Sequence, residues 1–279
     1  MAMRWLGAGV LAASFSAAAA NLAVPPAPLT AAEIVEKNMA ARGGVEAWRR
    51  IQTMVWVGKV GNAAGATPPM PFVLELKRPN KTHFEINALE QKFVRFFDGT
   101  HGWKVRPVRG GGPETQPFSQ PEVNFARDEF VIDGPLIDYQ AKGVAISLGG
   151  IDEVEGRRAY RLEIKLPSGA RRRVWIDADN FLDLRSDRPA SNPLSKSATV
   201  SVFYRDYRTI EGLQIPLTIE SSVAAGTASE RLVIDKVSLN PTLPDRNFAV
   251  PSTPRSRRAI VRVDGDSATM VSGPGRPSP

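Results

Sequence analysis

Apolar and polar residues alternate most regularly in the segment from Phe72 to Pro107. A period of two residues indicates β-strands with one face sheltered from water. Turn-forming residues interrupt the alternation at Pro79-Asn80 and at Asp98-Gly99, and Asp-Gly between apolar runs favours a hairpin. We therefore expect at least three antiparallel strands in one curved sheet. The apolar side of its first two strands carries Phe72, Leu74, Leu76, Phe84 and Ile86.

The same two-residue period returns in the second half of the chain, where tight-turn sequences separate the runs. One further strand is expected before the first segment, at 53–60. The later strands are expected at 144–154, 159–166, 171–177, 181–187, 199–210, 213–223 and 231–239. About ten or eleven short strands with regularly spaced turns favour a mainly β sandwich or barrel. A sheet of that many strands has to curl, which gives it one concave face.

Helix signals occur near the start of the chain and in its middle. The residues Thr30–Glu33 form a capping-box pattern that begins a helix, and Gly43-Gly44 ends it. A second short helix is expected over Val45–Ile51. The segment 119–142 has no two-residue period, and Gly134-Pro135 divides it. It predicts either two short helices or one helix and a loop, laid as a lid over an opening in the sheet.

The first 20 residues have the layout of a secretory signal peptide. Arg4 precedes an apolar run from Trp5 to Ala20, and the small residues at its end suit cleavage. The run is short and rich in alanine, although an uncleaved membrane anchor stays an alternative. We therefore expect an exported protein located in the periplasm.

The rest of the chain is expected to form one domain between two irregular ends. Residues 21–29 are a proline-rich spacer. Residues 30–251 contain all the periodic segments and form the one expected domain. Residues 252–279 combine Arg, Ser, Gly and Pro with few apolar side chains, which predicts a disordered basic tail.

Composition narrows the classes of function. The chain has 36 Lys and Arg against 29 Asp and Glu, a formal net charge of +7. That excess suits nucleic acid or an anionic membrane surface, but no nucleic-acid-binding motif accompanies it, so we expect no nucleic-acid partner. The chain has no cysteine, which excludes a disulfide, a thiolate nucleophile and a cysteine-ligated metal. The hydrophobic content of 42% is enough for a substantial core.

No set of residues predicts catalysis. The two histidines are His83, on the polar side of its strand, and His101, in a turn, which is weak evidence for a metal site. Motifs of serine hydrolases, phosphate-binding loops and zinc proteases are lacking. Asp133 and Asp138 form either a carboxylate pair or helix caps, and Arg171-Arg172-Arg173 is either a solvated face or a contact for an anionic membrane or partner. We expect no enzyme activity, no metal and no cofactor.

The apolar side of the expected sheet is larger than a core requires, and it predicts a lipid-binding interior. Burying one methylene contributes about 0.8 kcal/mol, so one long acyl chain is stabilised by roughly 10 kcal/mol. The alternative is that these side chains pack against one another, and periodicity does not separate the two. The expected ligand-binding residues are Phe72, Leu74, Leu76, Phe84, Ile86 and Trp103 on one wall, Leu162, Ile164, Val174 and Ile176 on the other, and Leu136 and Ile137 in the lid.

Two motifs in the first half of the chain resemble the periplasmic lipoprotein carrier LolA and its relatives. They are Lys77-Arg78-Pro79-Asn80 at the end of a strand and Asp98-Gly99-x-x-x-Trp103-x-x-x-Pro107. Three later stretches, Gly156–Tyr160, Val174–Asp177 and Phe181–Arg185, resemble the broader group of outer-membrane lipoprotein-sorting proteins. The resemblance covers the chain from Thr30 to Phe248.

The resemblance implies an unclosed antiparallel β-barrel, capped by helices, whose interior takes acyl chains. It assigns to Arg78 the role of a lid latch, in which the guanidinium donates several hydrogen bonds to lid carbonyls. Ligand entry would break these bonds and free the lid. The carrier has an aromatic residue at the position of Thr82, and this departure leaves delivery of lipoproteins open.

From the resemblance we expect a monomeric periplasmic carrier. It would shelter the acyl chains of a lipid or acylated lipoprotein during transfer between envelope membranes. The alternative is an envelope-stress sensor or protein-interaction module on the same fold, with an inner- or outer-membrane protein as its partner.

Overall fold

The computed structural model describes residues 29–249 apart from 63–64, 66–67, 89–90, 109–111, 130, 191–198 and 224–228, together with 260–264 and 267–271. The predicted signal peptide and nearly all of the predicted spacer lie outside the described residues. None of the described helices is long and apolar enough to cross a membrane.

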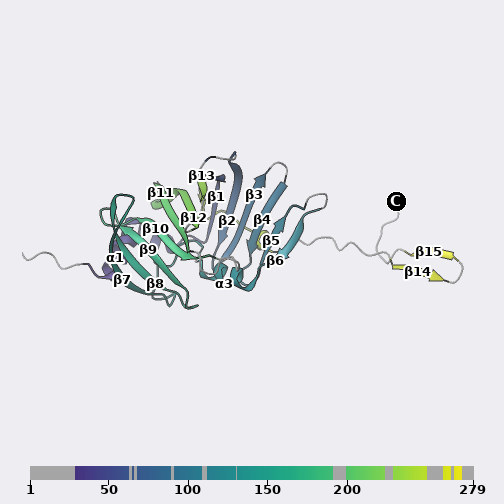
Figure 1. The fold of residues 1–279 in the computed structure, drawn as a ribbon, viewed down its shortest axis with the longest axis horizontal. Coiled ribbons are helices and arrows are strands. Elements are labelled where there is room, and N and C mark those ends of the chain that lie inside the picture. The colour runs from purple at the N-terminus through teal and green to yellow at the C-terminus, as the bar shows by residue number, and fades with distance from the viewer. Residues whose placement is uncertain are drawn as a thin grey trace, which may run out of the picture.

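Thirteen antiparallel strands form one sheet in the described part of the chain (Figure 1). They are β1 Thr53–Asn62, β2 Met70–Lys77, β3 Lys81–Ala88, β4 Gln91–Phe97, β5 Gly102–Arg106, β6 Glu114–Pro117, β7 Ala145–Val154, β8 Arg157–Lys165, β9 Arg171–Asp177, β10 Asp183–Pro189, β11 Thr199–Ile210, β12 Leu213–Val223 and β13 Ser229–Leu239. Their order is β6-β5-β4-β3-β2-β1-β13-β12-β11-β10-β9-β8-β7. The first and last strands of this sheet in chain order, β1 and β13, therefore pair at its centre, and β6 and β7 are its two edges.

This architecture confirms the mainly β class and the unclosed sheet. The expected number of strands is too low, in part because β6, Glu114–Pro117, has no alternation of apolar and polar residues and is held by pairing with β5. Hairpin turns lie where the sequence predicts them, with Glu155-Gly156 and Glu211-Gly212 at positive φ. Those two-residue turns match the twist of the strands that they join.

Four helices accompany the sheet in the described residues: α1 Ala31–Ala41, α2 Val45–Arg49, α3 Gln120–Asp128 and the 3-10 helix η2 Asp245–Phe248. α1 begins at the predicted capping box, where the Glu33 amide donates to Thr30 Oγ1 at 3.3 Å. The middle segment forms one helix, α3, followed by consecutive turns over 131–143. It is therefore the second of the two predicted alternatives, a helix and a loop.

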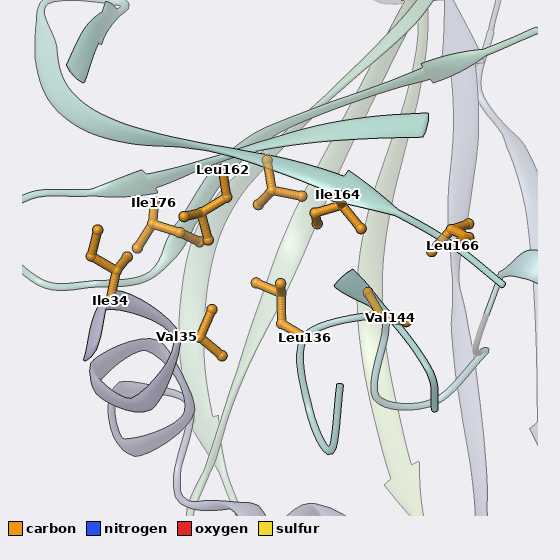
Figure 2. Packing of buried hydrophobic residues seen from close by; sticks show 9 residues of the cluster. Ile34, Val35, Leu136, Val144, Leu162, Ile164, Leu166 and Ile176 are labelled. Atoms are coloured by element: carbon orange, nitrogen blue, oxygen red, sulfur yellow. The ribbon is translucent and has the colours of Figure 1, made fainter. Parts of the chain in front are cut away.

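Helix α1 lies against one face of the sheet, here called the inner face (Figure 2). Ile34 and Val35 are fully buried, and they pack in a cluster with the apolar side chains of β8 and β9. The strand residues of this cluster are Leu162, Ile164, Val174 and Ile176. The inner face at this end of the sheet is therefore covered by a helix.

The turn segment 131–143 is wedged between two buried clusters. Leu136 belongs to the cluster beneath α1. Its neighbour Ile137 belongs to a second cluster that includes Trp48 of α2 and Leu76 of β2. Both residues are at most 2% exposed, so this segment is anchored to the inner face.

The opposite face of the sheet, here called the outer face, is covered near β3 by η2. Phe248 is fully buried, and Asn247 Nδ2 donates to Glu75 Oε2 at 3.1 Å. Asp245 pairs with Lys77 at 2.8 Å and with Lys81 at 3.1 Å. The chain thus returns from β13 across the outer face before the predicted tail begins.

One described element lies within the predicted tail. The strands β14 Ile260–Asp264 and β15 Ser267–Val271 pair as a hairpin, in a sheet of their own. The rest of the predicted tail, 252–279, lies outside the described residues. A short alternation of apolar and polar residues in Ile260–Asp264 accompanies the hairpin, and the overall composition of the tail masks it.

Candidate functional site

A strip of half-buried apolar side chains runs along the inner face between β12 and β3. In the register of the sheet, Leu74 lies opposite Trp56 of β1 and Phe84 of β3, and directly opposed residues share one face. The strip surrounds a buried cluster of Val60, Phe72 and Ile234. Its half-buried members, here called the apolar strip, are Trp56, Met70, Leu74, Phe84, Ile86, Leu217, Ile219, Leu232 and Val237.

Phe93 of β4 extends the apolar strip towards the edge of the sheet. It lies opposite Ile86 and is 40% exposed. Contiguous exposed apolar surface is typical of binding sites, and Phe93 makes the apolar strip longer.

The predicted ligand-binding residues divide into three groups, and the third consists of Trp103 alone. Leu74, Phe84 and Ile86 belong to the apolar strip. Eight are buried among other side chains, namely Phe72, Leu76, Leu136, Ile137, Leu162, Ile164, Val174 and Ile176. The alternative that apolar side chains pack against one another therefore describes the predicted β8–β9 wall, which α1 covers. The accessible part of the predicted interior is confined to the apolar strip.

Trp103 lies on the outer face, which corrects its predicted place on the wall that contains Phe84. The register pairs Trp103 with Phe96 and Phe96 with His83, and His83 points away from its neighbour Phe84. The Trp103 ring stacks on Phe96 with 5.6 Å between ring centroids. Two turns separate Phe84 from Trp103, and one residue more or less in either turn reverses the face.

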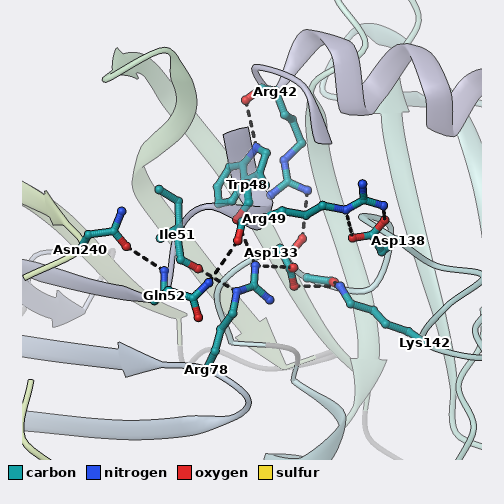
Figure 3. A network of polar contacts seen from close by, with 11 residues as sticks. Arg42, Trp48, Arg49, Ile51, Gln52, Arg78, Asp133, Asp138, Lys142 and Asn240 are labelled. Atoms are coloured by element: carbon teal, nitrogen blue, oxygen red, sulfur yellow. Dashed lines mark hydrogen bonds and ion pairs between the residues drawn. The ribbon is translucent and has the colours of Figure 1, made fainter. Parts of the chain in front are cut away.

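Arg78 follows β2 and joins three parts of the chain (Figure 3). Its Nε donates to the Ile51 carbonyl at 2.7 Å, and its Nη2 donates to the Trp48 carbonyl at 3.1 Å. The same Nη2 donates to Asp133 Oδ2 at 2.7 Å. The resemblance implied bonds to carbonyls of the lid, whereas these carbonyls belong to α2 and the residues after it. The middle segment supplies a carboxylate instead.

Asp133 is the centre of this network. Its side chain is 4% exposed, and Lys142 Nζ lies 2.8 Å from Oδ1. Arg42 Nη1 donates to the Asp133 carbonyl at 3.3 Å. A buried carboxylate is tolerated only with compensating charges and hydrogen bonds, and here two cations provide them. The network fixes segment 131–143 to α2 and to the end of β2.

Asp138, the second carboxylate of this segment, pairs with Arg49 of α2. Arg49 Nε donates to Asp138 Oδ2 at 2.9 Å. This bond holds the pKa of Asp138 below its ordinary value. Asp133 and Asp138 each have cations of their own, so they are neither the predicted carboxylate pair nor helix caps.

Helix α3 is attached to the sheet through polar contacts. Of its residues, Glu122 alone is buried, and its carboxylate lies 3.2 Å from Arg95 of β4 and 3.0 Å from Lys104 of β5. Asn80 Nδ2 donates to two carbonyls in the last turn of α3, at 2.7 and 3.0 Å. No fully buried apolar side chain anchors this helix, in contrast to α1.

The far end of α3 contacts the other half of the sheet. Arg172 of β9 donates to the Asp128 carbonyl at 3.2 Å and to Glu129 Oε1 at 2.9 Å. Ser168, in the turn between β8 and β9, donates to Asp128 Oδ2 at 2.8 Å. The Arg172 side chain is 10% exposed, so within the predicted arginine run this residue is neither solvated nor available to a membrane. Helix α3 thus spans from β4 and β5 to β8–β9.

A cavity of about 360 Å³ lies apart from the apolar strip. Its lining residues are Val154, Glu155, Arg157, Asn180, Leu182, Asp183, Leu184, Tyr204, Arg205, Asp206 and Tyr207. None of the predicted ligand-binding residues lines it. Burial raises the pKa of Asp183 and of Tyr207, and the Tyr207 hydroxyl donates to the Asp183 carbonyl at 3.0 Å. This bond satisfies the Tyr207 hydroxyl within the protein.

No group of His, Asp and Glu in the described part of the chain is placed to hold a metal ion. His83 Nδ1 lies 3.0 Å from Glu75 Oε2 on the outer face. His101 is exposed in its turn, and its ring is 5.9 Å from that of Trp103. Neither histidine is part of the apolar strip.

Sequence reasoning missed the polar residues that hold α3, which are Asn80, Arg95, Lys104, Glu122 and Arg172. One signal was available. The segment around α3 carries acidic residues where the opposing strands carry basic ones. This distribution of charges is compatible with many different ion pairs. The fold determines which acidic residue contacts which basic residue.

Comparisons with known proteins bear on the fold. No protein-family model matches the chain, and no curated protein matches it in sequence. A LolA superfamily protein from Nitrosomonas europaea matches in structure with a TM-score of 0.53 and 15% identity, over 80% of this chain and 99% of that one. A putative outer-membrane lipoprotein-sorting protein domain from Vibrio parahaemolyticus matches with a TM-score of 0.51 and 12% identity, over 77% and 94%. A DUF1329 family protein from Desulfovibrio piger matches with a TM-score of 0.50 and 13% identity, over 78% and 97%. The chain therefore has a LolA-like fold.

Proposed function

We propose that this protein is a periplasmic carrier that binds the acyl chains of a lipid or acylated lipoprotein on the inner face of its sheet. The observation that carries the proposal is the apolar strip beside a helix that polar contacts hold in place. Each methylene that moves from water onto the strip contributes about 0.8 kcal/mol, so a long acyl chain supplies roughly 10 kcal/mol. Helix α3 is the lid in this proposal, and segment 131–143 is its anchored base.

The polar attachment of α3 suits a lid that opens. Hydrogen bonds and ion pairs exchange for contacts with water at a small net cost, since a typical hydrogen bond contributes about 0.5–1.5 kcal/mol. Removing a packed apolar side chain from a core costs about 2–5 kcal/mol. The lid can therefore leave the sheet while α1 and segment 131–143 stay packed.

The direct test is native mass spectrometry of the mature protein after gentle purification, followed by incubation with phospholipid and with an acylated peptide. A retained or acquired lipid mass is the expected result. Phe93→Gln is expected to weaken acyl binding about tenfold, because a buried phenyl ring contributes about 1.5–3 kcal/mol. A protein that stays empty with both ligands would overturn the proposal.

Val57 provides a matched control for Phe93. Both side chains are 40% exposed, but Val57 lies opposite Val73 on the outer face. Val57→Gln is therefore expected to leave acyl binding unchanged. Equal losses in the two variants would show that binding does not use the inner face, and would favour the alternative of an envelope sensor or interaction module.

A further inference from the structure

The apolar strip ends at two cations on the inner face. In the register of the sheet, Arg95 of β4 lies opposite Phe84 on one side and Lys104 of β5 on the other. Directly opposed residues share a face, so Arg95 and Lys104 both continue the surface that Phe84 and Phe93 form. The wall changes from apolar to basic within two residues of β4.

A carboxylate of the protein itself neutralises these cations. Glu122 Oε2 lies 3.0 Å from Lys104 Nζ, and Glu122 Oε1 lies 3.2 Å from Arg95 Nη2. The Glu122 side chain is 10% exposed and that of Lys104 is 17% exposed. Burial raises the pKa of Glu122, but the Ser119 amide and hydroxyl, Lys104 and Arg95 together lower it to about 2. The carboxylate is therefore ionised at neutral pH.

Opening the lid removes that counterion. Glu122 is on α3, whereas Arg95 and Lys104 stay on the strands. Lys104, whose side chain is 17% exposed, is destabilised when it loses its partner, whereas Arg95 is 43% exposed and stays partly solvated. An uncharged acyl ligand on the strip would not replace the lost carboxylate, whereas an anionic group attached to the acyl chain would. The favoured ligand thus carries its negative charge next to its apolar chain.

We propose that Arg95 and Lys104 form a binding site for the phosphate group of a phospholipid whose acyl chains lie on the apolar strip. Glu122 occupies this site while the lid is closed. The inference rests on the proposed function and names the class of lipid within it. Arg95 offers two N–H groups in a plane, and Lys104 adds a point charge, which together match the oxygen atoms of a phosphate.

The test compares two amphiphiles with the same alkyl chain, dodecyl phosphate and dodecyl maltoside, below their micelle concentrations. Isothermal titration calorimetry of the mature protein measures both dissociation constants. We expect the phosphate to bind about tenfold more tightly, because a charge-assisted bond to a shielded cation is worth about one decade in affinity. Inorganic phosphate is titrated separately, and we expect it to bind far more weakly because it lacks the chain.

The double variant Arg95→Gln/Lys104→Gln is expected to lose the preference for phosphate and to keep its affinity for the maltoside. Its matched control is Lys92→Gln/Arg173→Gln, which removes the same charge from the outer face and is expected to keep the preference. Glu122→Gln keeps the capping side chain of α3 but removes the competing carboxylate. It is expected to raise the preference for phosphate several-fold, and this variant tests the site even if the double variant folds poorly.

The outcomes separate the two proposals. Equal affinity for both amphiphiles in the wild type, or a preference that survives Arg95→Gln/Lys104→Gln, would overturn the headgroup site and leave the acyl carrier intact. Inorganic phosphate binding as tightly as dodecyl phosphate would overturn the lipid as its source. A wild-type protein that binds neither amphiphile would overturn both the headgroup site and the carrier.

Discussion

The charged residues around segment 131–143 differ from surface ion pairs because little water reaches them. The side chains of Asp133 and Lys142 are 4% and 16% exposed. Burial lowers the pKa of Lys142, and the neighbouring Asp133 carboxylate opposes that shift. Breaking a buried pair costs about 3–5 kcal/mol, whereas an exposed pair contributes about 0–1 kcal/mol. Arg78, which completes this group, is therefore expected to matter for stability.

We expect Arg78→Gln to lower the free energy of unfolding by about 3 kcal/mol, because Asp133 loses one of its two cations. In the Asp133→Asn background the same change is expected to cost about 2 kcal/mol less, since coupled groups are not additive. Urea denaturation of the four proteins measures the coupling. Lys92→Gln, at a side chain that is 64% exposed, is the control and should change stability by less than about 0.5 kcal/mol. Zero coupling would show that Arg78 acts through its carbonyl contacts alone.

The ionisation of Glu122 predicts a pH dependence of stability. Its pKa is lowered from 4.5 to about 2 in the folded protein, so the folded state binds this proton less readily than the unfolded chain does. The stabilisation is present above pH 4.5 and is lost as the pH falls towards 2. Thermal melts between these pH values should show a steeper loss of Tm for the wild type than for Glu122→Gln. If Tm falls equally with pH in the two proteins, the lowered pKa of Glu122 does not contribute to the pH dependence of stability.

At the scale of elements, the strands are predictable because each one alternates against a single sheltered face and most end in a recognisable turn. Helix α1 is predictable from its capping box and the glycines that end it. β6 is not, because Glu114–Pro117 has no apolar alternation and is held by β5 alone. An element can thus be predicted when its own residues show alternation, a turn sequence or a helix cap.

The candidate site is less predictable than the elements because it depends on contacts between distant residues. Arg78 and Asp133 are 55 residues apart in sequence, and Asp133 has no local feature that distinguishes an ion pair from a cap. Trp103 is misplaced by counting through two turns. The predicted β8–β9 wall is apolar, but its pattern does not reveal that α1 covers it. Periodicity identifies an apolar face without identifying what lies on it.

The attachment of α3 predicts a local effect of Asn80→Ala. Asn80 bonds two carbonyls in the last turn of α3, which have no partner within the helix. Removing the amide is expected to raise hydrogen exchange in α3 by about tenfold while β1 and β2 keep their protection, because lid opening is separate from global unfolding. Asn87→Ala is the control, since Asn87 Nδ2 donates to Glu85 of its own strand at 3.1 Å. Uniformly faster exchange would show that α3 is part of the global folding unit.

At the scale of the whole molecule, the sheet has two unpaired edges, and α3 links the two halves that meet at β1 and β13. Glu122 in its first turn contacts β4 and β5, and its last turn contacts Asn80, Ser168 and Arg172. In the proposed function, a guest that enters the inner face separates α3 from at least one half. This makes the end of α3 at Asp128 the point where closure can be tested without touching the apolar strip.

We expect that a disulfide between Asp128→Cys and Ser168→Cys blocks lipid uptake. Ser168 Oγ lies 2.8 Å from Asp128 Oδ2. Because the chain has no cysteine of its own, the two introduced cysteines have no competing partner. Oxidation fixes α3 to the β8–β9 turn, and acyl binding, followed by native mass spectrometry, should fall to background. Reduction should restore it, which makes each sample its own control. Each single-cysteine variant should load lipid under both conditions. Full loading of the oxidised pair would show that lipid reaches the apolar strip without lid movement, and the polar contacts of α3 would then serve stability alone.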